Sequence, residues 1–294
     1  MRSLRWLLCR AAIWLGILVA LEPAARGAIG IADGLVSRVV VLSIHVVDAE
    51  THGRVLRFLT EDLGFPVDYG PEIHGQRHYA AVYAGNLFLE PCGPFPGALY
   101  HTNRFQALFY GMNCRSDRGA ESVERALTAS GVGFSRDGEV FVLREAPLVE
   151  HMHWSVDCRT REAGSALNEE TLRRKLADTQ ESGPGVRRVR EIRVSCRDES
   201  DLHVWSRVLG RPEMREGAVW SPGGNLRIRL VREGVRGVMG IDLEVDSVDR
   251  AMRHLGARRI STRPVPGGIE LDPAKACGLS VRLIDRDSQP GSRQ

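Results

Sequence analysis

Apolar and polar positions alternate at the start of the stretch 39–92. After that, apolar residues recur every three or four positions. The alternation predicts a β-strand with Ser43 and His45 on one face and the intervening aliphatic residues on the other. The helical period that follows ends at Leu63-Gly64. Three short extended pieces complete the stretch, and the last of them ends at Glu90. The pattern therefore predicts one βαβββ unit.

The same order of patterns returns three more times along the chain. A second unit covers residues 105–158, a third begins at Val189, and a fourth runs from Gly237 to Leu283. Two short motifs recur at matching places in the first and third units: Leu63-Gly64 with Leu209-Gly210 after the helix, and Gly85-Asn86-Leu87 with Gly224-Asn225-Leu226 in the closing hairpin. A repeat constrains the whole fold, so these copies outweigh any single motif.

The repeats and the composition together divide the chain. Its start has two arginines, an apolar stretch and small residues around Ala25-Arg26-Gly27, which is the pattern of a signal peptide. Export to the periplasm or the medium is therefore expected, with an uncleaved membrane anchor as the alternative. Asn168 and the two glutamates after it predict the start of a short connecting helix. The expected parts are a signal peptide or anchor over 1–28, a first domain over 38–158, a linker with a short helix over 159–188, a second domain over 189–286 and a flexible tail over 287–294.

The composition is that of an ordinary globular protein, with 43% hydrophobic and 26% charged residues. The net charge of +3 is spread along the chain, so no nucleic-acid-binding surface is expected. Five cysteines follow the signal peptide at wide spacings and without a CxxC motif, which predicts neither a disulfide framework nor a zinc knuckle. Buried thiols are expected, and one disulfide in an oxidising compartment is the alternative.

The repeated units resemble the vicinal oxygen chelate superfamily, which includes glyoxalase I, bleomycin-resistance proteins and extradiol dioxygenases. The likeness is carried by His45 on the first strand, by Leu-Gly after each first helix, by the Gly-Asn-Leu hairpins and by the segment 271–278, LDPAKACG. In that superfamily two βαβββ units pair into one cupped sheet. The resemblance therefore implies an α+β protein in which four βαβββ units form two glyoxalase-like domains, the second of them degenerate.

The resemblance also implies a divalent metal ion in the N-terminal cup, held by side chains of first and last strands. His45 and Glu90 match two of these ligand positions, and His153 or Asp157 on the last strand of the second unit would complete the set. Imidazole and carboxylate ligands suit iron, manganese, nickel or zinc. The expected metal site therefore comprises His45, Glu90 and one of these two residues.

Other side chains around the expected cup are assigned as follows. Tyr110 stands where extradiol enzymes commonly have a histidine, and with His151 it is expected to contact a substrate. His45 could instead face the cup without a metal and hydrogen-bond Glu90. A register slip of one residue at Pro91 would turn Glu90 to the other face of the sheet. The histidines without a partner pattern are expected at the surface: His52, His101, His203 and His254.

The C-terminal pair of units lacks the metal-ligand residue types. Aligning the Leu-Gly motifs puts Glu191 opposite His45, and aligning the hairpins puts Arg229 opposite Glu90. A glutamate and an arginine can form a charge-assisted hydrogen bond but cannot bind a metal as the first pair would. The second domain is therefore predicted to be a structural copy.

Two functions from different classes follow, and an exported scaffold with both cups filled by side chains is a third possibility. The first is an exported metal-dependent lyase, isomerase or dioxygenase that acts on a small oxygen-bearing organic substrate. The second is a metal-free protein of the bleomycin-resistance type that sequesters a small molecule, and Tyr110 in place of a histidine favours it. Extradiol dioxygenases usually keep their competent site in the C-terminal half, which weakens that comparison. A homodimer is one expected assembly, because the units can pair within the chain or between protomers.

Overall fold

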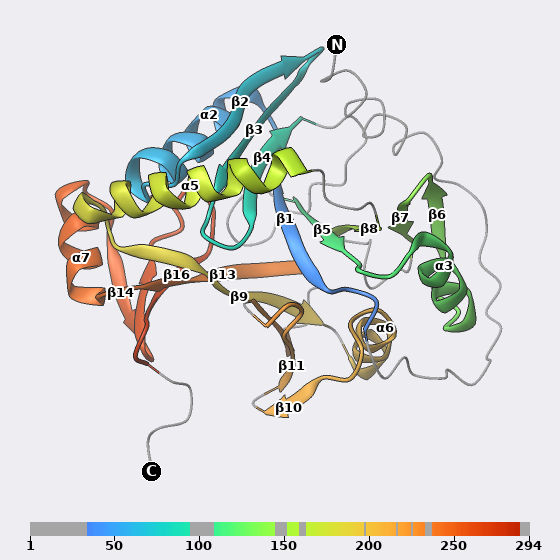
Figure 1. Ribbon diagram of the computed structural model, residues 1–294. Coiled ribbons are helices and arrows are strands. Elements are labelled where there is room, and N and C mark those ends of the chain that lie inside the picture. Colours follow the sequence, from blue (N-terminus) through green and yellow to red (C-terminus); the bar gives the residue numbers. More distant parts are fainter. Residues whose placement is uncertain are drawn as a thin grey trace.

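The computed structural model consists of two domains, each built on one eight-stranded mixed sheet (Figure 1). The signal-peptide prediction and His151 lie outside the described residues. Within the part that is described, no helix is long and apolar enough to cross a membrane. The described residues are 34–94, 109–144, 152–158, 163–196, 198–215, 217–224, 226–232 and 237–288.

The first sheet contains two βαβββ units side by side, in the strand order β2-β3-β4-β1-β5-β8-β7-β6. The first strands of the two units, β1 and β5, are antiparallel neighbours at its centre, and each is parallel to the last strand of its own unit. The strands are β1 (Arg38–His45), β2 (Val67–His74), β3 (Arg77–Tyr83), β4 (Phe88–Gly93), β5 (Phe109–Arg115), β6 (Phe134–Asp137), β7 (Val140–Leu143) and β8 (Met152–Asp157).

The second sheet repeats this topology in the order β10-β11-β12-β9-β13-β16-β15-β14. Its central pair is β9 and β13, again antiparallel. The predicted fold, four βαβββ units in two cupped-sheet domains, is therefore confirmed. The strands are β9 (Val186–Cys196), β10 (Glu213–Arg215), β11 (Gly217–Trp220), β12 (Arg227–Arg232), β13 (Gly237–Val245), β14 (Thr262–Val265), β15 (Gly268–Leu271) and β16 (Val281–Asp285).

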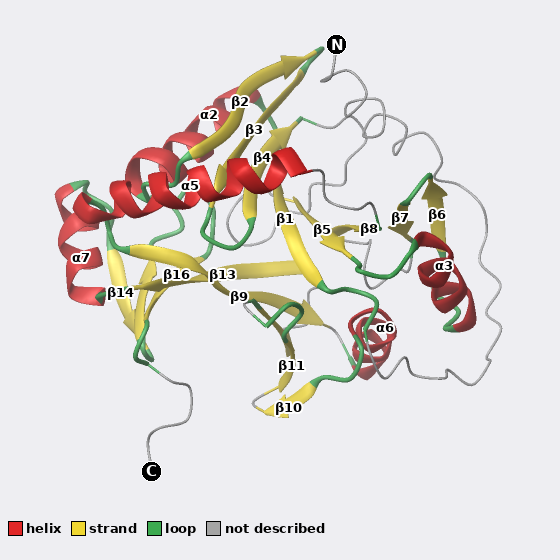
Figure 2. Cartoon of the chain, viewed as in Figure 1, coloured by secondary structure: helices red, strands yellow, loops and turns green. Residues whose placement is uncertain are grey.

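The helices lie around the two sheets (Figure 2). Side-chain caps begin three of them: the carboxylates of Asp48 and Asp198 and the hydroxyl of Ser247 accept backbone N–H groups of the first turn. The helices are α2 (Ala49–Arg57), continued by a π-helical turn η2 (Phe58–Asp62), then α3 (Ala120–Ala129), α5 (Ala163–Ser182), α6 (Glu199–Leu209) and α7 (Val248–Ala257).

The connecting helix α5 is longer than expected. It has 20 residues and begins before Asn168, which lies in its interior instead of capping it. Glu170, expected in the first turn, forms ion pairs with Arg173 and Arg174 three and four residues later. Such pairs support the middle of a helix, so the acidic residues marked the helix correctly but not its start.

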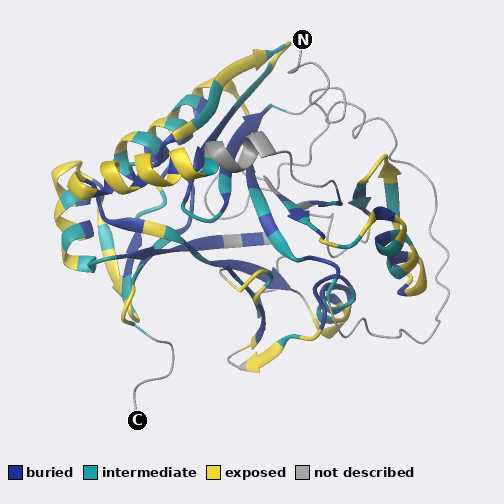
Figure 3. Ribbon diagram, in the orientation of Figure 1, coloured by how far each residue is buried: buried dark blue, intermediate teal, exposed yellow. Residues whose placement is uncertain are grey.

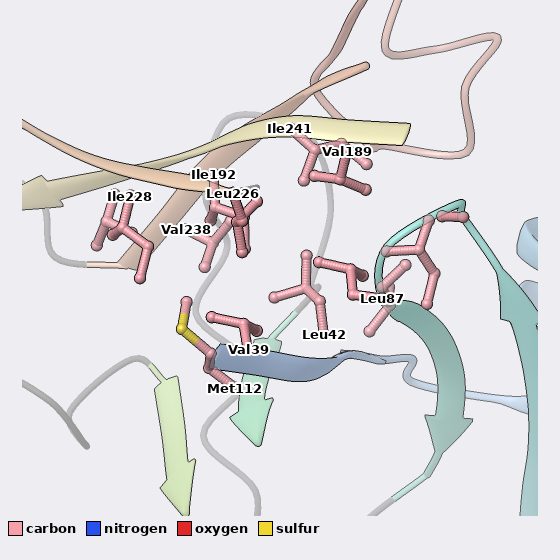
Figure 4. Packing of buried hydrophobic residues seen from close by; sticks show 14 of the residues in the cluster. Val39, Leu42, Leu87, Met112, Val189, Ile192, Leu226, Ile228, Val238 and Ile241 are labelled. Atoms are coloured by element: carbon pink, nitrogen blue, oxygen red, sulfur yellow. The ribbon is translucent and has the colours of Figure 1, made fainter. Parts of the chain in front are cut away.

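The two sheets pack against each other through their apolar faces (Figure 4). Leu42 and Met112 are register partners in the first sheet, and Ile192 and Ile241 are register partners in the second. All four are at most 3% exposed, and the central strands around them are largely buried (Figure 3). The opposite face of each sheet, called its cup below, therefore points away from the other domain.

A second set of contacts joins the domains through hairpin turns. The β3–β4 turn lies on the start of β9, where Asn86 Nδ2 donates to Val189 O at 2.8 Å and Val189 N donates to Asn86 Oδ1 at 3.0 Å. The β11–β12 turn lies on the residues before β1, and a Cβ on Gly223 would be 2.8 Å from Ser37 O. Each domain thus presents the same turn to the same strand of the other. We call these two contacts the domain joint.

Candidate functional site

The N-terminal cup is the face of the first sheet that carries Ser43 and Glu90. These two residues are register partners in the parallel pair β1–β4, and that pairing continues without a shift to His45 and Cys92. Glu90 is 2% exposed, and Ser43 Oγ donates a 2.8 Å hydrogen bond to Glu90 Oε2. The register slip that would have turned Glu90 away does not occur, because β4 continues as a regular strand through Pro91.

A chain of hydrogen bonds crosses this cup from one unit to the other. The hydroxyl groups of Tyr69 and Ser43 both donate to the Glu90 carboxylate, one to each oxygen. Asn113 Nδ2 lies 3.5 Å from Ser43 Oγ, and Ser155 Oγ donates to Asn113 Oδ1 at 2.6 Å. A buried carboxylate requires such donors to offset its lost hydration. Sequence reasoning missed Tyr69 and Asn113, because the pairing that brings their strands together is not local.

Of the predicted site residues, His45 lies in this cup. It is 5% exposed and stands two positions after Ser43 on β1, so it shares that strand face. The backbone of His153 pairs with Gly111, and Gly111 pairs with Ser43, so the three residues form one row across the sheet. Nothing is described of the His153 side chain. Asp157 is half-buried at the end of β8.

Of the two residues expected to contact a substrate, the structure describes only the backbone of Tyr110. His151 lies outside the described residues. The backbone of Tyr110 pairs with Ile44 on one side and Met152 on the other. Ile44 is fully buried in the hydrophobic core, so the row that contains Tyr110 differs from the row of Ser43. The structure thus brings together His45 and Glu90, and their roles stay predictions.

Comparison with known proteins now places this architecture. No family model and no curated protein sequence matches the chain. Homoprotocatechuate 2,3-dioxygenase from Arthrobacter globiformis superposes with a TM-score of 0.59 and 13% identity, over 90% of this chain and 85% of that chain. The enzyme from Brevibacterium fuscum, in complex with 3,4-dihydroxyphenylacetate, gives 0.58 and 13%, over 90% and 86%. The chain has the fold of the vicinal oxygen chelate superfamily. At this identity the likeness concerns the fold alone.

The described residues of this vicinal oxygen chelate fold do not provide a complete metal site. No three His, Cys, Asp or Glu side chains among them lie close enough together to hold a metal ion. Both oxygens of Glu90 already accept hydrogen bonds from hydroxyl groups. In the part of the chain that the structure describes, Glu90 is therefore part of a hydrogen-bond network.

The second domain aligns with the first differently than the Leu-Gly motif suggested. Arg229 pairs with Arg193 in β12–β9, as Glu90 pairs with Ser43 in β4–β1. Ser195, two residues after Arg193, therefore matches His45, and Glu191 does not. The helix between the strand and the Leu-Gly motif explains the error. In the first unit α2 is extended by the five residues of η2, whereas α6 ends at Leu209 without such a turn, so counting back from the motif reaches too far along β9.

His52 corrects an expectation about the surface. It is 2% exposed, its Nε2 lies 3.1 Å from Pro91 O, and its ring centroid is 5.5 Å from that of His78. Burial, and secondly the nearby His78, lower the pKa of His52. Pro91 pairs with Ile44, so this contact lies behind the cup, under α2.

The cysteines contribute packing. The five described ones are free thiols, and four of them are buried: Cys92, Cys114, Cys158 and Cys196. Burial raises the pKa of the Cys158 thiol to about 11, which keeps it protonated and unreactive at neutral pH.

Proposed function

We propose that this protein binds a small, uncharged, oxygen-bearing organic molecule in the N-terminal cup without a metal ion. The observation that supports this most is the use of Glu90, whose two oxygens are held by Ser43 and Tyr69. A carboxylate held in this way organises hydroxyl and amide groups for a ligand.

The neighbouring side chains define which hydrogen-bonding groups such a ligand would carry. Asn113 carries both a donor and an acceptor, and the His45 ring can act as either, depending on its tautomer. Both belong to strands at the centre of the sheet, so their positions are fixed by the fold. Hydroxyl and carbonyl oxygens of a small organic molecule match these groups. The signal-peptide pattern of residues 1–28 extends the proposal to a protein that acts after export.

A metal-dependent lyase, isomerase or dioxygenase is the second candidate function. The observation in its favour is the row that contains His153, Gly111 and Ser43, next to His45 and Glu90. Two histidines and one carboxylate are a known arrangement for iron. The metal-dependent function requires His153 as a third metal ligand beside His45 and Glu90.

Metal content and ligand binding separate the two candidates. The full chain is incubated with Fe(II), Mn(II), Ni(II) or Zn(II) in turn, dialysed, and analysed by mass spectrometry. Binding of catechol, a probe with two neighbouring oxygens, is then titrated with and without EDTA. The binding proposal expects no retained metal and catechol binding that survives EDTA and weakens in His45→Ala.

The matched control is Ser195→Ala, which changes the corresponding position of the other cup and should leave catechol binding unchanged. About one retained equivalent of metal that disappears in His45→Ala and persists in Ser195→Ala would overturn the binding proposal and support the enzyme.

A further inference from the structure

The cup of the second sheet is rich in arginine. One row across its central strands reads Arg227, Glu191, Asp242 and Arg282 in β12, β9, β13 and β16. In the next row Arg229 pairs with Arg193. These two rows hold four arginines and two carboxylates, which leaves an excess of two positive charges.

Two of the four arginines are satisfied within the cup. Arg229 Nε donates to Glu191 Oε1 at 2.7 Å, and Arg193 Nε donates to Asp242 Oδ1 at 2.9 Å. The side chains of Arg229 and Arg193 are 16% and 11% exposed, so both pairs are largely shielded from water. Each carboxylate of the two rows thus has one close partner already.

The other two arginines have only distant partners. Arg227 Nε lies 3.8 Å from Glu191 Oε2, beyond hydrogen-bonding distance. Arg282 Nε is buried, has no hydrogen-bond partner among the described residues, and lies 3.9 Å from Glu270 Oε1. Glu270 is itself engaged by Arg263, which brings one more positive and one more negative charge. The excess of two positive charges remains.

The backbone of β13 leaves room for the Arg193 guanidinium group. A Cβ on Gly240 would be 2.5 Å from Arg193 Nη2 and 2.7 Å from Ser280 Oγ. Only glycine therefore lets the Arg193 side chain cross β13 and donate to Ser280 Oγ at 3.3 Å. Gly111 is the residue of the first domain that corresponds to Gly240, and it lies in the same row as Ser43 and Glu90. At equivalent positions the first cup is acidic and the second is basic.

We propose that the C-terminal cup binds a small oxyanion, a carboxylate or phosphate group, beside Arg282, in the row that also holds Arg227. The side chains of Arg227 and Arg282 are 25% and 34% exposed, so a ligand can reach them, and an excess of positive charge in a partly enclosed cup favours a bound anion. Guanidinium groups match carboxylate and phosphate oxygens in geometry and form charge-assisted hydrogen bonds with them. The bound group supplies the acceptor that Arg282 Nε lacks. The second domain then has a ligand of its own, opposite in charge preference to the first.

Calorimetric titration of the full chain tests this site. Inorganic phosphate and succinate are titrated separately at ionic strength held constant with sodium chloride, so that general screening does not contribute. Saturable binding of about one equivalent of either probe is expected, and the tighter of the two identifies the oxyanion. Arg282→Gln should weaken binding at least about tenfold, the effect of one lost charge-assisted hydrogen bond.

Arg232→Gln is the matched control, since Arg232 is on β12 but its side chain is 66% exposed and pairs with Glu199 at the surface. It should bind as the wild type does. If Arg282→Gln does not fold, as judged by circular dichroism, Arg227→Gln gives the same test. No saturable heat with either probe, or equal weakening by Arg232→Gln and Arg282→Gln, would overturn the proposal.

Discussion

Substitution of Gly85 by alanine should disrupt the domain joint. Gly85 has φ +89°, and a Cβ on it would be 2.0 Å from Arg187 O and 2.9 Å from the Arg187 carbonyl carbon. Both atoms are backbone of the other domain, so no side chain can move aside. Non-bonded carbon and oxygen atoms do not approach so closely, and the turn would have to withdraw from β9 by about 1 Å or more.

The cost has two parts. An alanine with positive φ costs about 1–2 kcal/mol wherever it stands. Withdrawal also breaks the hydrogen bonds that Asn86 and Ala84 make with Val189, three in all. At about 1 kcal/mol each, these add about 3 kcal/mol. Gly85→Ala should therefore lower the free energy of unfolding by about 4–5 kcal/mol.

Gly75→Ala separates the two parts, because Gly75 has φ +65° and a Cβ there would meet nothing within 4 Å. Urea denaturation followed by tryptophan fluorescence should show a loss of only about 1–2 kcal/mol for this control. If both variants lose the same free energy to within about 0.5 kcal/mol, the contact of the turn with β9 contributes nothing and the reasoning is refuted.

Two further variants test contacts described above. Gln180→Ala should lower the free energy of unfolding by at least about 2 kcal/mol, since it leaves Leu63 O and Val186 N without the buried amide that bonds them at 2.8 Å each; an unchanged urea midpoint would contradict this. His52 holds a pKa below its ordinary 6.5 because burial and His78 disfavour its charge. The unfolded chain therefore binds the proton more readily, and stability present above pH 6.5 should be lost as the pH falls through and below that value. His52→Gln should reduce this loss between pH 7.5 and 5, and an identical pH profile would contradict the assignment.

Local patterns predicted the units well because each βαβββ unit is built from signals within a few residues. The alternation around Ser43 gave the correct cup face, and Leu63-Gly64 marked the end of the first helical segment. Contacts between strands that are distant in the sequence could not be predicted from such local patterns. Tyr69 and Asn113 reach Glu90 and Ser43 only through strand pairing, and the extra turn η2 after α2 shifted the comparison of Glu191 with His45.

The domain joint has a consequence for how the two cups can change. Because each domain offers the same turn to the same strand of the other, the chain is arranged like a twofold homodimer whose protomers are covalently linked. The surfaces that hold the halves together lie between the sheets, and the cups lie on the outer faces. Substitutions in one cup therefore leave both the joint and the other cup intact. After duplication of an ancestral domain, such a molecule can keep an acidic cup in one half and acquire a basic one in the other.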